Sequence, residues 1–152
     1  MPGSWPQHEL PNLTDANCAI TSPKKRGYNC IAWAAGNDTR NWWPDPVGIG
    51  YWPQGVPREV TFNAFLAAYR TLGYEVCADA SLEEGREKIA IYGQLNADGL
   101  LEPTHAALQL ESGQWTSKLG NFEDIRHTDV GSVEGPLYGT AMFYMSRKRR
   151  AA

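Results

Sequence analysis

The chain has 152 residues, of which 42% are hydrophobic and 20% are charged, a composition typical of one globular domain with its own core. Its formal net charge of −3 argues against a nucleic-acid-binding surface spread over the whole chain. No run approaches the roughly 18 apolar residues of a membrane-spanning helix, and the first residues lack a signal-peptide pattern. We therefore expect a cytoplasmic protein without nucleic-acid or membrane partners, unless a secretion machinery delivers it.

The cysteines and histidines are scattered singly along the sequence. Three cysteines, Cys18, Cys30 and Cys77, form an odd set that suits a reducing compartment. No C-x-x-C or H-x-x-x-H pair occurs, and no phosphate-binding or dinucleotide-binding glycine motif is complete. The sequence therefore predicts neither a metal site nor a cofactor.

Residues 1–27 are rich in Pro, Asn, Thr and Ser and predict an extended lead-in to a single domain over 28–146. That domain opens with an apolar segment, 28–36, which predicts a short helix. Asn29 can cap its first turn, and Gly36 suits the left-handed residue that ends a helix. Because this segment has no polar face, we expect the helix to be buried.

Cys30 lies in the first turn of this predicted helix. Free backbone amides and the helix dipole at such a position stabilise a thiolate, so the segment could carry a nucleophile. The alternative is that Cys30 is a small core residue, as free cysteines usually are.

The next segment, 37–57, is dense in proline and glycine but holds Trp42, Trp43 and Trp52. Proline excludes regular structure here, whereas the indole rings need burial. We expect an ordered loop that either walls a substrate cleft or covers a sheet edge.

From residue 60 onward the sequence predicts one helix followed mainly by strands. Residues 60–73 form the clearest amphipathic helix, with Thr61 as its cap and Gly73 at its end. The other predicted elements are strands at 74–78, 88–92, 104–110, 114–119 and 137–145, a turn of helix at 81–85, a turn at 96–99 and a basic tail at 147–152. This order predicts an α+β domain with an antiparallel sheet packed on the helices.

A catalytic thiol needs a base. His8 lies in the lead-in and His127 in a polar connection, whereas His105 begins the strand at 104–110. The paired strand holds Thr116, Ser117 and Lys118, and one of them can come beside the His105 ring. Without Cys30, His105 is better explained as a partly buried histidine bonded to a backbone carbonyl.

With Cys30 opening a buried helix and His105 starting a strand of an antiparallel sheet, the chain resembles the papain-like cysteine hydrolases, in particular the compact NlpC/P60 type of bacterial amidase and peptidase. The segments YNCIAWA at 28–34, THAA at 104–107 and WTSKLG at 115–120 are also similar to an uncharacterised family of small bacterial proteins. The first resemblance implies a papain-like fold with a Cys-bearing buried helix packed on the sheet. Asn29 before Cys30 departs from the usual Asp of the NlpC/P60 type.

The same resemblance implies a Cys30–His105 dyad and a third residue that orients the imidazole. Strand spacing favours Ser117 for that role, but a carboxylate or amide orients a histidine better, so Asp124 or Asn121 could act from the adjoining loop. The Cys30 amide, with the Asn29 side chain, would stabilise the oxyanion.

These considerations predict a cysteine-dependent hydrolase of an amide bond, with a peptide or other amide as substrate. Peptidase, amidase and glutamine deamidase activities, and acyl transfer, use the same machinery. The alternatives are a non-catalytic module that holds a peptide or glycan in the Trp-rich loop 42–57, and an interaction protein in which Cys30 is only a core residue.

Overall fold

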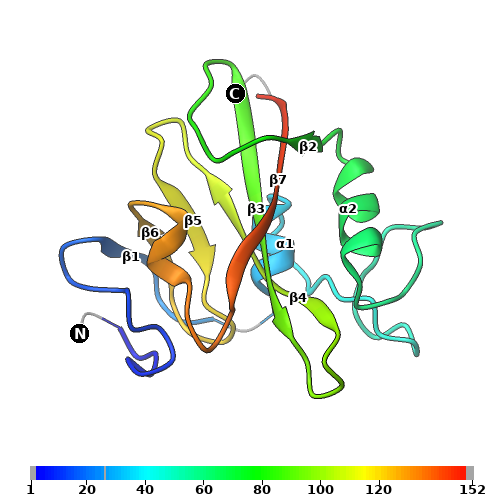
Figure 1. Cartoon of the computed structure of the whole chain (residues 1–152), viewed down its shortest axis with the longest axis horizontal. Coiled ribbons are helices and arrows are strands. Elements are labelled where there is room, and N and C mark those ends of the chain that lie inside the picture. Colours follow the sequence, from blue (N-terminus) through cyan, green and yellow to red (C-terminus); the bar gives the residue numbers. More distant parts are fainter. Residues whose placement is uncertain (1–2, 26, 150–152) are drawn as a thin grey trace.

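A single antiparallel sheet organises the protein (Figure 1). The computed structural model describes residues 3–25 and 27–149. The strands lie in the order β1-β6-β5-β4-β3-β7-β2. Their bounds are Cys18–Ser22 (β1), Glu75–Cys77 (β2), Arg86–Leu95 (β3), Leu101–Gln109 (β4), Trp115–Lys118 (β5), Asp124–His127 (β6) and Thr140–Lys148 (β7). The helices are α1 (Cys30–Ala34), α2 (Phe62–Arg70) and a 3-10 turn, η1 (Val130–Val133).

The papain-like α+β fold expected from the sequence is wrong. The described residues form mainly the seven-stranded sheet, and their two α-helices are short, with five residues in α1 and nine in α2. A papain-like domain instead packs a substantial helical layer on its sheet. The physical reason lies in the segment 37–57, where proline and glycine leave ordered coil in place of helix. The segment 81–85 also forms no helix.

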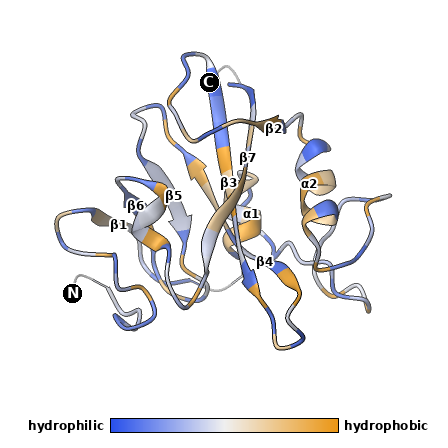
Figure 2. Cartoon of the chain, in the orientation of Figure 1, coloured by the Kyte–Doolittle hydropathy of each residue, from blue (hydrophilic) through white to orange (hydrophobic). Residues whose placement is uncertain are grey.

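Both helices begin where the sequence predicts. The Asn29 side chain accepts from the Ala32 amide at 3.0 Å, and the Thr61 hydroxyl accepts from the Ala64 amide at 3.2 Å. Every residue of α1 except Trp33 is buried, as expected for a helix without a polar face. Hydrophobic and hydrophilic residues alternate along α2 (Figure 2), which buries only its apolar side. No helix in the described residues is long and apolar enough to cross a membrane.

Two segments differ from the sequence-based expectation at the chain ends. The region 1–27 is part of the packed domain, because β1 joins the sheet beside β6 and three of its apolar side chains, Trp5, Leu10 and Leu13, are buried. At the other end β7 extends through Lys148, so the predicted tail begins inside the sheet. Residues 150–152 of that tail lie outside the described residues.

The sheet separates two apolar clusters. One holds α1 and α2 with Ile89, Ile91 and Ala106, and the other holds the buried side chains of 1–27 with Tyr92 and Ala107. Successive residues of a strand point to opposite faces, which explains why neighbours on β3 and β4 enter different clusters.

Pairing around β4 is unequal. β3 and β4 pair along most of their length, from Ile89↔Leu108 to Leu95↔Leu101. β4 and β5 pair only at Leu108↔Thr116 and Gln109↔Trp115. Towards the start of β4 the two strands therefore diverge, and the candidate site lies there.

Candidate functional site

Cys30 is the first residue of α1, which packs on β4 and β5. The residue is 7% exposed, and its thiol interacts with the backbone amide of Ala106, the residue after His105. Burial raises the pKa of the thiol to about 11, and the amides of Ala106, Ile31 and Cys30 itself, followed by the charge of Lys118, oppose that rise. The resting group is therefore a neutral thiol that is surrounded by groups able to stabilise its anion.

His105 heads a chain of buried hydrogen bonds. Its Nε2 lies 3.0 Å from Ser117 Oγ, and Ser117 Oγ lies 2.8 Å from His127 Nε2. At the far end His127 Nδ1 lies 2.8 Å from the carbonyl oxygen of Asp129. None of the three side chains is more than 1% exposed, so water does not compete for these bonds.

The carbonyl of Asp129 determines the direction of every bond in this relay. A carbonyl oxygen only accepts, so His127 carries its proton on Nδ1. Burial lowers the pKa of His127 to about 4, so at neutral pH its Nε2 is unprotonated and accepts from the Ser117 hydroxyl. Ser117 Oγ then accepts from His105 Nε2–H. His105 is thereby held with a bare lone pair on Nδ1.

That Nδ1 atom is buried and has no hydrogen-bond partner among the described residues. The ring stacks on Tyr138, with centroids 4.0 Å apart and planes 14° apart, and meets Tyr92 edge-on at 5.2 Å. Burial, and then the proximity of His127, lower the pKa of His105 well below its usual value. An unprotonated imidazole nitrogen without a partner can act as a base, and an orphaned buried polar atom usually has a functional reason.

Cys30 and His105 approach β4 from its two faces. Cys30 packs in the cluster that contains Ala106, whereas the His105 ring packs against Tyr92 and Tyr138 of the other cluster. No hydrogen bond joins the thiol to His105 Nδ1 in this structure. The thiol interacts with the Ala106 amide next to His105. Burial, and then the charge that Cys30 carries as a thiolate, raise the pKa of Tyr138, which is stacked on the imidazole.

Asp124 does not orient His105. In the ladder between β5 and β6, Lys118 pairs with Asp124 and Ser117 pairs with Ile125, so Asp124 points to the face opposite Ser117. There it accepts a 2.6 Å bond from the Tyr28 hydroxyl and lies 3.9 Å from Lys118 Nζ, with both charged side chains fully buried. Asp124 therefore neutralises a buried lysine beside Cys30.

The structure also places the two amide side chains predicted to belong to the site, Asn29 and Asn121. Asn29 Oδ1 accepts from the amides of Ala32 and Trp42, and its Nδ2 donates to the Trp42 carbonyl at 2.7 Å. It thus acts as a helix cap and fastens the loop to α1, with one Nδ2 hydrogen bonded to the Trp42 carbonyl. Asn121 is exposed in the connection between β5 and β6, where it borders a hollow with Lys24 and Lys25.

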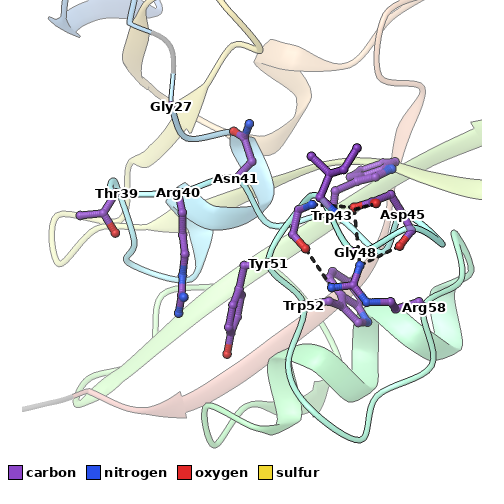
Figure 3. A pocket seen from close by; sticks show the side chains of 12 residues that line it. Gly27, Thr39, Arg40, Asn41, Trp43, Asp45, Gly48, Tyr51, Trp52 and Arg58 are labelled. Carbon is purple, nitrogen blue, oxygen red and sulfur yellow. Dashed lines mark hydrogen bonds and ion pairs between the residues drawn. The ribbon is translucent and has the colours of Figure 1, made fainter.

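The three tryptophans of the loop 37–57 divide between core and cleft. Trp42 is 4% exposed and stacks near Tyr69 in the core, with centroids 6.5 Å apart. Trp43 and Trp52 line an open pocket of about 840 Å³ (Figure 3). Trp52 is itself only 5% exposed. A cleft wall therefore exists, but Trp42 does not contribute to it.

Sequence reasoning missed His127 and Lys118. His127 was assigned to a polar connection because the segment 124–127 alternates weakly, yet Ile125 and His127 share one face of β6. The turn at Gly120 and Asn121 was the available signal, since a hairpin there brings His127 opposite Trp115 and diagonal to Ser117. Lys118 gave no signal, because a lysine is rarely fully buried.

Known proteins offer limited comparison. The search of curated proteins finds no match to this chain, and neither does the search of solved structures. Residues 19–146, which run from β1 into β7, match one family profile, described as a domain of unknown function (DUF7689). Since this match covers most of the sequence, the chain belongs to the DUF7689 family.

Proposed function

We propose that the protein is a cysteine-dependent hydrolase of an amide bond, with Cys30 as the nucleophile and His105 as the general base and acid. The observation that carries the proposal is the relay from His105 to Asp129, which leaves a buried lone pair on His105 Nδ1. A histidine with a purely structural role would be expected to use both ring nitrogens. The proposal does not depend on a papain-like fold.

The relay favours this assignment because it gives the imidazole the tautomer that the reaction needs. His105 Nδ1 would accept the thiol proton while its Nε2–H remains bonded to Ser117 Oγ. Ser117 and His127 are then positioning residues, which hold the ring in place and polarise the hydroxyl that faces the developing imidazolium. This is the role that a carboxylate or amide has in other cysteine and serine hydrolases.

The surroundings of the thiol support the second half of the reaction scheme. Lys118 is fully buried, and its charge lowers the pKa of Cys30, so it would stabilise the thiolate once the proton has moved. The thiolate attacks the amide carbon, the amine leaves with the proton from His105, and water hydrolyses the resulting thioester. Because the resting thiol has a pKa of about 11, we expect proton transfer to accompany substrate binding, without a standing ion pair.

Acylation by p-nitrophenyl acetate tests the proposal, with release of p-nitrophenolate followed by absorbance and the adduct located by mass spectrometry. We expect one acetyl group on Cys30, none in Cys30→Ala, and a rate lower by about 10²- to 10⁴-fold in His105→Gln. The double variant Cys18→Ser/Cys77→Ser is the matched control and should behave as the wild type. A rate at Cys30 that does not change in folded His105→Gln, or equal labelling of all three cysteines, would contradict the dyad.

A further inference from the structure

An open hollow lies along the loop 37–57 (Figure 3). It has a volume of about 840 Å³ and is lined mainly by residues 39–58, together with Gly27, three residues before Cys30. Asn29 fastens this loop to α1 through two hydrogen bonds to the backbone of Trp42. A molecule in the pocket would therefore lie against the segment that leads directly to the thiol.

Arg40 provides the free charge of this pocket. Its guanidinium lies over the ring of Tyr51, 3.5 Å from the centroid, and in Figure 3 the two side chains run alongside each other. Within residues 3–25 and 27–149 no carboxylate lies at ion-pair distance from Arg40. The aromatic ring holds the planar guanidinium while its N–H donors stay available, the arrangement in which arginine binds a carboxylate through two parallel hydrogen bonds.

The other charges on the pocket wall neutralise each other. Asp45 accepts from the amides of Gly50 and Ile49 at 2.6 and 2.7 Å, and these bonds lower its pKa. Arg58 lies 3.5 Å from the same carboxylate and donates to the carbonyls of Asp45 and Gly50. The pocket wall thus carries one uncompensated positive charge in a chain of net charge −3.

We propose that this pocket binds an acidic residue of a peptide substrate, with the carboxylate on Arg40 and the neighbouring apolar side chain against Trp43. Its role in substrate selection rests on the proposed hydrolase function, but binding itself does not require turnover. The pairing of a free guanidinium with aromatic walls favours a carboxylate that is attached to an apolar chain over a bare inorganic anion.

Isothermal titration of the full chain carrying Cys30→Ala tests this inference, with N-acetyl-Glu-Leu-amide and N-acetyl-Gln-Leu-amide as probes. We expect the Glu peptide to bind more tightly, and Arg40→Gln to weaken only that peptide, by about 10- to 100-fold, which is the contribution of a charge-assisted pair. Arg126→Gln, which removes the same charge from an exposed position on β6, is the control and should leave the preference unchanged.

Equal binding of the two peptides would overturn the inference, and so would an equal effect of Arg40→Gln and Arg126→Gln. Inorganic phosphate is a third probe, and tighter binding of phosphate than of the Glu peptide would also overturn it. Failure of the hydrolase proposal is distinguishable, because it would appear as absent acylation of Cys30 while the Glu preference persists. Normal acylation without a Glu preference would remove only this inference.

Discussion

Replacing Ser117 with Ala removes the one atom that joins the two buried imidazoles. Ser117 Oγ accepts from His105 Nε2 at 3.0 Å and donates to His127 Nε2 at 2.8 Å. The substitution is nearly isosteric and leaves the backbone of β5 unchanged. It therefore changes the hydrogen bonding of the relay with little change in packing.

The expected cost follows from the burial of the two histidines. His105 is 0% and His127 1% exposed, so neither nitrogen can bond to water instead. A buried polar group without a partner costs about 1–3 kcal/mol, and two such groups cost about 2–6 kcal/mol. That is a large share of the roughly 5–15 kcal/mol by which a domain of this kind is stable.

Thr116→Val is the matched control on the same strand. Thr116 Oγ1 also takes part in two hydrogen bonds, accepting from Trp33 Nε1 at 3.0 Å and donating to the Ile125 carbonyl at 3.1 Å, but it faces away from the relay. Because Trp33 is only half-buried, water can replace part of the loss, and we expect about 1–2 kcal/mol. Urea denaturation followed by circular dichroism compares the two variants.

Nitrogen-detected NMR of the histidine rings reads the tautomers directly. The wild type and Thr116→Val should show His105 protonated on Nε2 and His127 on Nδ1, whereas Ser117→Ala should lose the fixed tautomer of His105. Acylation of Cys30 should then fall at least roughly tenfold in Ser117→Ala, because the base no longer has a defined lone pair. A wild-type His105 protonated on Nδ1, or a Ser117→Ala variant with unchanged stability and tautomer, would refute the reasoning.

Three further predictions concern the same region. Asn29→Ala should lower the free energy of unfolding by about 2–3 kcal/mol, since it loses a helix cap and two bonds to Trp42. Asn29→Asp keeps the acceptor and should lose about 1 kcal/mol in the same denaturation assay. Equal losses in the two variants would contradict the role of the Asn29 side chain in holding the loop at Trp42. Lys118→Met should cost about 3–5 kcal/mol because Asp124 is left as an unpaired buried charge. Adding Asp124→Asn removes that charge but keeps an acceptor for the Tyr28 hydroxyl, so it should restore most of the loss; no recovery in urea titrations would contradict this account. Because burial lowers the pKa of His127 to about 4, the unfolded chain binds more protons between that pH and roughly 6.5, so stability should be full above pH 6.5 and fall by about 3 kcal/mol as the pH drops to 4. His105, whose pKa burial also lowers, adds to this fall, and equal unfolding free energies at pH 7.5 and 4.5 would exclude it.

Local patterns determined much of the fold. The caps Asn29 and Thr61 were predicted as helix starts, and both bond as expected, because a cap depends only on a side chain and the amides two or three residues later. The strands β3, β4, β5 and β7 were predicted within a few residues, since alternating or continuous apolar runs are visible in the chain itself. The turn of helix predicted at 81–85 does not form.

The sequence did not reveal which strands pair over long distances in the chain. β1 is a short strand at the edge of the sheet that forms because β6 lies beside it, and β6 lies between β1 and β5. The same holds for the region 1–27, whose composition predicted an extended lead-in, although Leu10 and Leu13 are buried in the second cluster. Such contacts depend on partners more than a hundred residues away, and local hydrophobic periodicity does not reveal them.

For the candidate site, the sequence by itself predicted Cys30 at a helix start and Ser117 within reach of His105 on the neighbouring strand, because both follow from strand and helix spacing. Only the tertiary structure decided the remainder. Register turned Asp124 away from His105 and toward Lys118, and it brought His127 behind Ser117. The bare lone pair of His105 follows from a carbonyl at Asp129 that only accepts, a fact of three-dimensional hydrogen bonding that residue types alone do not contain.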